Sequence, residues 1–133
     1  MGRRGSSWSW IQTTDLPIGA RLKSTAQGWP MARYIESGGA WFVRSHTIEY
    51  LRQALLGDRI AVCTWVGSME ERTSLRNTVF LRTAARRQIL VRAQTLWTFV
   101  DTGRGRSMPV SQDVRQAFEV VASEEEALAA AGL

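Results

Sequence analysis

The stretch from Ala40 to Asp101 decides the fold, and it reads AWFVRSHTIEYL (40–51), DRIAVCTWVGSM (58–69), RTSLRNTVFLRT (72–83) and RQILVRAQTLWTFVD (87–101). In all four pieces β-branched and aromatic residues alternate with polar ones, which is the period of a strand with one buried and one wetter face. The connections QALLGD, MEER and AARRQ are only a few residues long. Such short connections favour antiparallel pairing of consecutive strands, so the pattern predicts a four-stranded meander.

The chain before this stretch is harder to interpret. The segment WIQTTDLPIGARLKSTAQ (10–27) has apolar residues at patchy helical spacing, but Pro17 and Gly19 stand in its middle. An interior proline costs a helix about 3 kcal/mol, so we expect a broken helix here. Residues 1–9 are polar and glycine-containing, and we expect them to be disordered.

Short helices are predicted on both sides of the strands. MARYIES (31–37) can form one that Gly38 and Gly39 terminate. After the strands, Ser111 is a plausible N-cap for a helix over Gln112 to Val121. The Ala- and Glu-rich tail at residues 122–133 predicts a further short helix or a frayed extension.

Length and composition limit the class of protein. A chain of 133 residues has room for one domain, so we assign residues 1–133 to a single unit. No apolar run approaches the roughly 18 residues that span a bilayer. The start MGRRGSSWSW has no apolar segment of a secretory signal, and the single Cys63 cannot form an internal disulfide. We therefore expect a cytoplasmic protein that does not enter membranes.

Basic residues exceed acidic ones, 17 Lys and Arg against 12 Asp and Glu, which gives a formal charge of +5. This excess suits nucleic acid, a phosphate-bearing small molecule, or no particular partner. Arginines with aromatic neighbours could form a nucleic-acid platform on a sheet. A half-solvated sheet has the same pattern; the residues concerned are Arg72, Arg76, Arg82, Arg92, Trp65 and Trp97.

Few residues are suited to metal or covalent chemistry. One cysteine and one histidine, Cys63 and His46, lie in different predicted strands, so we expect no metal site. We interpret Cys63 as a small core residue and His46 as a packed or edge histidine. The GRG at 103–105 follows a strand without the spacing of a phosphate loop, so its arginines either contact phosphates or form a solvated turn.

Two motifs in order carry a family resemblance. IEYLRQALLGD (48–58) matches the pattern I-E-Y-L-x-x-A-x-x-G-D, and Ala93, Thr95, Trp97, Val100 and Asp101 match A-x-T-x-W-x-x-V-D, followed by T-G-R and Pro109. In this combination the chain, from about Gln27 to Phe118, resembles the hotdog-fold acyl-CoA thioesterases of the 4-hydroxybenzoyl-CoA thioesterase type.

The resemblance implies an α+β protein of the hotdog fold, in which an antiparallel sheet wraps around a central α-helix, here shortened or broken. It implies hydrolysis of an acyl-CoA or acyl-carrier-protein thioester by a homodimer or homotetramer. No cofactor is implied, because CoA or the carrier protein is part of the substrate. In the family the thioester lies at the dimer interface, and the nucleotide end of CoA meets basic surface residues.

The front of the chain differs from the family pattern of a first strand, an Asp-x-Asp loop and then the central helix. WSWIQ (8–12) resembles the late part of that helix. The resemblance thus implies that the first strand and the catalytic acidic loop are missing, as a truncated or frame-shifted start would explain. Asp15 and Glu36 are candidates for a replacement carboxylate.

Substrate contacts are expected along one predicted strand. Hydroxyl and guanidinium groups there could bind the carrier's phosphates or pantetheine amides; the candidates are Arg72, Thr73, Ser74 and Arg76. Two alternatives remain open. A hotdog module could bind acyl-CoA or a partner subunit without cleavage, and a basic sheet could bind nucleic acid, with an affinity that falls steeply with salt.

Overall fold

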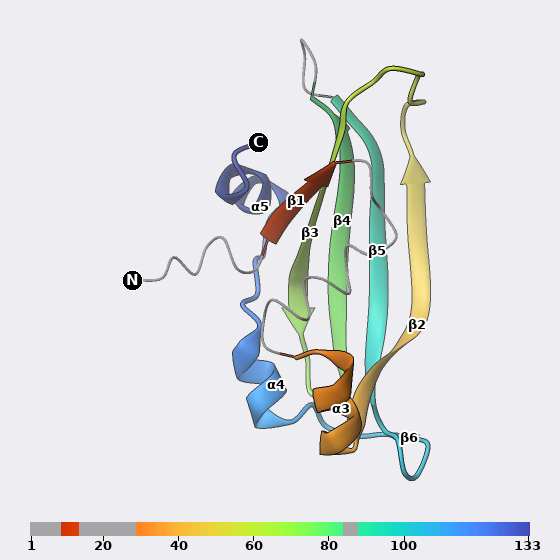
Figure 1. Ribbon diagram of the computed structural model, residues 1–133, viewed down its shortest axis with the longest axis vertical. Coiled ribbons are helices and arrows are strands. Elements are labelled where there is room, and N and C mark those ends of the chain that lie inside the picture. Colours follow the sequence, from red (N-terminus) through yellow and green to blue (C-terminus); the bar gives the residue numbers. More distant parts are fainter. Residues whose placement is uncertain (1–8, 14–28, 84–87) are drawn as a thin grey trace.

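The computed structural model describes residues 9–13, 29–83 and 88–133 of the chain. These residues form one antiparallel sheet with short helices around it (Figure 1). In chain order the elements are β1 (Ser9–Thr13), α3 (Met31–Ser37), β2 (Gly39–Tyr50), β3 (Ile60–Met69), β4 (Thr73–Arg82), β5 (Gln88–Asp101), β6 (Arg106–Ser107), α4 (Gln112–Ala117) and α5 (Glu124–Ala130). None of the described helices is long and apolar enough to cross a membrane.

The four predicted strands are confirmed as β2 to β5, but the meander is only partly correct. The strand order is β1-β3-β4-β5-β2, with β6 paired to β5. β2 therefore pairs with β5 and not with β3, its neighbour in sequence. The link at residues 51–59 crosses three strand spacings, about 14 Å, which is well within the reach of about 30 Å that such a segment has. The link at residues 51–59 is therefore compatible with an antiparallel sheet in which β2 and β3 are not neighbours.

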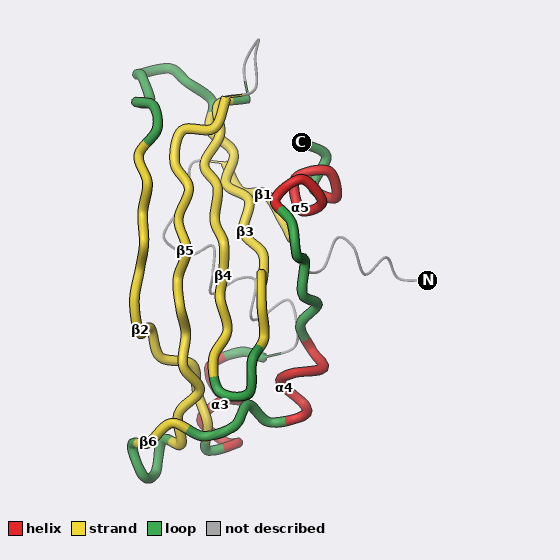
Figure 2. The backbone as a smooth tube through the Cα atoms, turned by 180° about the vertical axis from the view of Figure 1, so that it is seen from behind, coloured by secondary structure: helices red, strands yellow, loops and turns green. Residues whose placement is uncertain are grey.

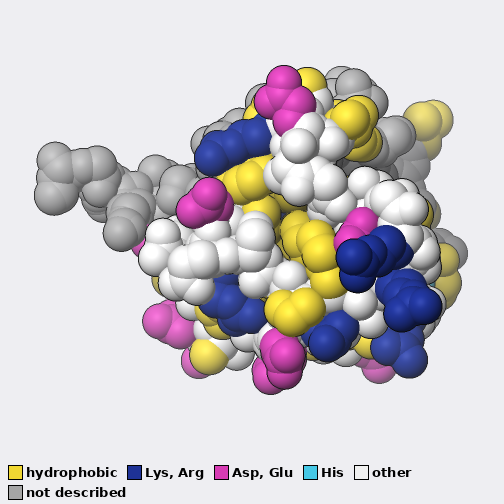
Figure 3. All heavy atoms as spheres, turned by 90° about the horizontal axis from the view of Figure 1, so that it is seen from below, with side chains coloured by type: hydrophobic (Ala, Val, Ile, Leu, Met, Phe, Trp, Pro, Cys, Tyr) yellow, Lys and Arg dark blue, Asp and Glu magenta, His cyan; other side chains and the backbone are white. Residues whose placement is uncertain are grey.

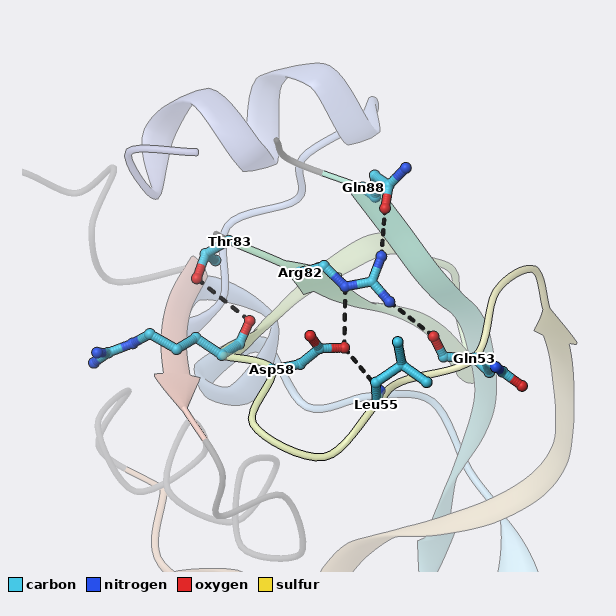
Figure 4. Close-up of polar contacts among 7 residues, drawn as sticks. Gln53, Leu55, Asp58, Arg82, Thr83 and Gln88 are labelled. Carbon is cyan, nitrogen blue, oxygen red and sulfur yellow. Dashed lines mark hydrogen bonds and ion pairs between the residues drawn. The ribbon is translucent and has the colours of Figure 1, made fainter. Parts of the chain in front are cut away.

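This crossover is fixed by a polar cluster at the end of the sheet (Figure 4). A carboxylate oxygen of Asp58, Oδ2, accepts hydrogen bonds from the Leu55 backbone N–H at 2.7 Å and from Arg82 Nε at 3.1 Å. Arg82 also donates to the Gln53 carbonyl at 2.8 Å and to the Gln88 side chain. Gly57 adopts a left-handed φ of 92° beside them. The Gly-Asp end of the first motif thus serves to hold the crossover.

The expectation for the front of the chain is wrong where the structure describes it. Ser9–Thr13 is the strand β1, antiparallel to β3, with Trp10 opposite Thr64 and Thr13 opposite Ala61. Residues 9–12 therefore do not belong to a helix, and a strand precedes α3. The helical interpretation rested on apolar spacing, but five residues can add to the edge of a sheet without a periodic pattern of their own. The rest of the predicted broken helix, residues 14–27, and residues 1–8 lie outside the described residues.

The predicted short helices are confirmed with small differences. α3 covers MARYIES and ends at Gly38, whose φ of 81° is the left-handed conformation expected of a terminating glycine. α4 starts after Ser111 but ends at Ala117, because Val120 bridges to Val66 of β3. In the tail, the Ser123 hydroxyl caps α5 by accepting from the Glu126 backbone N–H.

Core residues pack against both faces of the sheet. On the face that we call the α5 face, Cys63, Trp65 and Val79 pack against Ala127 and Leu128 of α5. Cys63 is fully buried there, as predicted.

The opposite face, which we call the α3 face, carries a second apolar cluster. Val66 and Phe99 pack there against Tyr34 of α3 and against Val114 and Phe118 of α4 and its end. Both α4 and α5 lie near the β3 end of the sheet, away from β2 (Figure 2). The two clusters contain different residues of β3, so its side chains divide between the two faces.

Candidate substrate-binding site

The structure separates the four predicted substrate contacts. Arg72 lies just before β4 with an exposed side chain, and its guanidinium donates to the Ser107 carbonyl at 3.0 Å. Thr73 is the half-buried first residue of β4. Ser74 is 5% exposed, and its hydroxyl donates to the Ser68 carbonyl at 2.9 Å, so it is committed to the β3–β4 turn. Arg76 lies further along the strand.

Arg76 belongs to the α3 face of the sheet. It lies opposite Val66 of β3 and opposite Thr95 of β5. Its guanidinium carbon is 5.8 Å from the centroid of the Trp97 ring, two residues along β5 on the same face. Arg76 is therefore surrounded by the sheet and an aromatic ring, in contrast to Arg72 at the surface.

A row of polar side chains continues from Arg76 across the sheet. Thr95 lies opposite His46 of β2, and the Thr95 hydroxyl is 2.9 Å from His46 Nδ1. His46 is exposed because β2 is the edge strand. The predicted edge histidine is confirmed, and the row Arg76–Thr95–His46 leads from the interior of the α3 face to the open edge of the sheet.

Two buried donors in this region have no hydrogen-bond partner among the described residues, Arg76 Nε and Trp97 Nε1. No described carboxylate forms an ion pair with Arg76 either. Burial lowers the pKa of Arg76 to about 10, while Tyr34 acts in the opposite direction. The side chain is still a cation at pH 7, so a positive charge without a counter-charge among the described residues lies on the α3 face.

A second group of arginines lies at the end of the sheet near β6. Arg104 and Arg106 are exposed in and after the β5–β6 turn, and Arg72 contacts Ser107 of β6. Seen from this end, Figure 3 shows basic side chains gathered beside an apolar centre. We call Arg72, Arg104 and Arg106 the basic rim. Asp101 organises the turn by accepting from the Gly103 and Arg104 backbone N–H groups at 2.9 and 3.1 Å.

The α5 face has a groove of about 410 Å³. Its lining includes Glu49 and Trp65, together with Arg92 and Glu124. The Arg92 guanidinium donates to the two Glu124 carboxylate oxygens at 2.8 and 2.9 Å, so the cation of this groove is already compensated. We place the candidate substrate site on the α3 face because the cation there, Arg76, has no described counter-charge.

This division also separates the residues of the hypothetical nucleic-acid platform. Arg76 and Trp97 lie on the α3 face, while Arg92 and Trp65 lie on the α5 face. Trp65 is only 2% exposed, so a base cannot stack on it.

Of the two candidate carboxylates, only Glu36 lies in the described part of the chain. Glu36 lies on α3 with an exposed side chain and makes no described hydrogen bond or ion pair. Asp15 lies outside the described residues. It follows the last residue of β1, Thr13, by two positions in the sequence.

The chain belongs to the thioesterase-like superfamily, whose family model matches residues 11–118. The match begins inside β1 and ends after α4, so it covers most of the described chain. A search of curated proteins gives no match.

Solved structures show that the fold is the hotdog fold. A protein described as an oleoyl thioesterase from Lactobacillus plantarum superposes with a TM-score of 0.73 at 14% identity, over 91% of this chain and 56% of that one. The present chain thus spans little more than half the length of that protein.

Two further structures match over nearly their whole length. The 4-hydroxybenzoyl-CoA thioesterase from Pseudomonas sp. strain CBS-3 has a TM-score of 0.67 at 17% identity, over 83% of this chain and 99% of that one. A 1,4-dihydroxy-2-naphthoyl-CoA thioesterase from Synechocystis has a TM-score of 0.64 at 18% identity, over 83% and 93%.

The sequence names Arg76 as a candidate contact but does not place it beside Trp97 and His46. Trp97 and His46 were considered only as a platform residue and an edge residue, because their approach to Arg76 depends on the β4–β5 and β5–β2 registers. Strand alternation alone could have placed Thr95 and Trp97 on one face of β5.

Proposed function

We propose that this chain is an acyl thioesterase that hydrolyses the thioester of an acyl-CoA or an acyl-carrier protein to the free acid and the thiol. Membership of the thioesterase-like superfamily over residues 11–118 carries the proposal. Two of the similar structures are named as thioesterases of aromatic acyl-CoA compounds, which supports a CoA thioester. Water is the second substrate, and no cofactor is required.

Asp15 is our candidate for the catalytic carboxylate. The resemblance implies an acidic loop directly after the first strand, and β1 supplies that strand. Asp15 is the first acidic residue after β1 in the sequence, and it lies inside the matched residues. A carboxylate there can activate water or attack the thioester carbonyl. Glu36 remains the competing candidate.

The basic rim is our candidate for binding the phosphates of the carrier. The basic rim is exposed and lies near β6. Its three side chains can therefore bind a flexible, highly charged group while they remain in contact with water. Arginine binds phosphate oxygens with two parallel hydrogen bonds, which favours this residue type.

A homodimer is the assembly that the sheet edge supports. Among the described strands β2 pairs only with β5, and every side chain from Phe42 to Tyr50 is exposed. A long edge strand with exposed apolar side chains is a template for pairing with a second strand. Those apolar side chains are Phe42, Val43, Ile48 and Tyr50. We further propose a cytoplasmic location, consistent with one buried thiol and no disulfide.

Thiol release from a panel of short, aromatic and long acyl-CoA thioesters, and from the matching acyl-carrier proteins, tests the proposal. We expect turnover of at least one member well above the background rate, with the chain shown to be folded by circular dichroism. Binding of CoA in calorimetry without any cleavage would favour the non-catalytic hotdog module instead. Affinity for generic DNA that falls steeply with salt, with neither CoA binding nor turnover, would favour the nucleic-acid hypothesis.

A further inference from the structure

The charge of Arg76 is the feature of the α3 face that the fold itself does not explain. Its Nε and the neighbouring Trp97 Nε1 are buried donors without a partner among the described residues. Arg76 as a whole residue is partly exposed, although its Nε is buried. A structural arginine of this kind would ordinarily be paired, because a buried charge without a counter-charge is costly.

An anion is a better partner for the Arg76 cation than a neutral hydrogen-bond acceptor. A neutral carbonyl or hydroxyl could accept from Arg76 Nε or Trp97 Nε1 but would leave the positive charge uncompensated. A carboxylate supplies the charge, and its two oxygens can accept from both side chains. The guanidinium carbon lies 5.8 Å from the Trp97 ring centroid, so both donors belong to the same region of the α3 face.

We propose that Arg76 and Trp97 bind a carboxylate carried by the acyl group, so that the substrates are monothioesters of dicarboxylic acids. The proposal rests on the proposed thioesterase function and names its substrate class. Thr95, opposite Arg76, and His46 beside it extend the polar row toward the open edge of the sheet.

The phosphates of the carrier are a less suitable partner for Arg76. They carry several charges, which the exposed basic rim matches with three arginines. Arg76 stands four residues along the strand from Arg72, about 13 Å at the rise of a β-strand. A single, partly desolvated cation at that depth suits a monoanion at the far end of an acyl chain.

Kinetics with matched substrates test the proposal. Succinyl-, glutaryl- and adipoyl-CoA are compared with butyryl-, pentanoyl- and hexanoyl-CoA, which have the same chain lengths without the carboxylate. A charged hydrogen bond corresponds to about a tenfold to hundredfold effect, so we expect kcat/KM to favour at least one diacid thioester by that factor. Arg76→Gln should abolish the preference and leave the neutral thioesters within about threefold, and Arg76→Lys should restore part of it.

Two further variants separate recognition from folding. Trp97→Phe keeps the ring but removes the N–H, and should reduce the preference about fivefold, as expected for one hydrogen bond. Arg92→Gln removes an arginine from the opposite face and should leave the preference unchanged. An equal loss on both substrate classes in Arg76→Gln, together with weaker inhibition by free CoA, would assign Arg76 to the carrier phosphates and overturn the proposal.

Binding measurements distinguish failure of this proposal from failure of the thioesterase function. Non-hydrolysable CoA thioethers with and without a terminal carboxylate are compared by calorimetry on the wild-type chain and on Arg76→Gln. If no thioester is cleaved but the carboxylate analogue binds at least tenfold more tightly only in the wild type, the recognition stands without the reaction. Equal affinities of the two analogues, or equal kcat/KM for both substrate classes across the panel, would contradict it.

Discussion

The guanidinium of Arg76 lies over the ring of Trp97, 5.8 Å from its centroid, on the face of the sheet that packs against α3. No described carboxylate pairs with this cation, so its burial costs stability in the absence of a ligand. The arginine is thus better explained by recognition than by folding.

Arg76→Met should therefore stabilise the free chain. Methionine keeps much of the aliphatic volume beside Trp97 and removes the charge, so we expect the free energy of unfolding in urea to rise by about 1 kcal/mol or more. Arg92→Met is the matched control on the opposite face; it breaks a partly exposed pair with Glu124 and should change stability by less than about 1 kcal/mol, in the destabilising direction. A clear loss of stability in Arg76→Met would mean that the guanidinium is a structural group.

Asp58 should make stability dependent on pH at the acid end. Its pKa is lowered from the usual 3.8, first by the Leu55 backbone N–H and further by Arg82. The carboxylate therefore stabilises the fold above about pH 4, and this contribution is lost as pH falls through the folded-state pKa. The stability difference between wild type and Asp58→Asn, measured by urea unfolding, should shrink as pH falls below 3.8.

Glu125→Gln is a suitable comparison for Asp58, because Glu125 is an exposed carboxylate in the first turn of α5. Its difference from wild type should be small at every pH. If the free energies of unfolding of the wild type and of Asp58→Asn change in parallel with pH across the acid range, Asp58 does not hold the crossover.

Charges on the β2 edge should prevent the proposed dimer. Val43 and Ile48 are 46% and 48% exposed in the single chain, and pairing of two β2 strands would bury such side chains. The double variant Val43→Lys/Ile48→Lys should shift the mass in light scattering from dimer to monomer. Leu56→Lys, at a fully exposed loop leucine, should leave the dimer intact. A wild-type monomer at all accessible concentrations would reject the edge pairing.

Gly39 should not tolerate a side chain. A Cβ at this first residue of β2 would lie 2.6 Å from Met108 Cε and 2.7 Å from the Phe99 ring, and Phe99 is 1% exposed. Overpacking of this kind costs about 1–3 kcal/mol, so Gly39→Ala should lower the melting temperature. At Gly103 the nearest atom to a Cβ would be Asp101 Oδ1 at 3.4 Å, and Gly103→Ala should change stability by only about 0.5 kcal/mol. Equal effects of the two substitutions would contradict this packing.

The strands could be predicted from the sequence because each carries its own alternation, as in Ile60 to Val66 of β3. The order of the strands could not be predicted. The link at residues 51–59 is long enough to allow β2 to lie either beside β3 or at the far edge of the sheet. The capped and glycine-terminated helices were also predictable, because Gly38 and Ser123 act locally. The surroundings of Arg76 depend on registers between three strands and are not a local property.

The front of the chain shows the opposite difficulty. β1 is only Ser9–Thr13 and lies at the sheet edge, so its residues carry too few alternations to distinguish a strand from part of a helix. If residues 10–27 formed a helix, Asp15 would lie within it; because β1 ends at Thr13, Asp15 instead follows a strand in the sequence. The strand β1 therefore makes Asp15 a stronger candidate for the carboxylate than the sequence pattern alone does.

The most direct measurement of the central claim is thiol release from acyl-CoA thioesters by the wild-type chain, Asp15→Asn and Glu36→Gln, all shown to be folded. Loss of a catalytic acid–base group costs about 10²- to 10⁴-fold, so we predict turnover by the wild type, a decrease of that size in Asp15→Asn, and an unchanged rate in Glu36→Gln. An unchanged rate in Asp15→Asn with a large decrease in Glu36→Gln would move the carboxylate to α3. No thiol release above background by folded wild-type protein, across the whole panel, would contradict the thioesterase function itself.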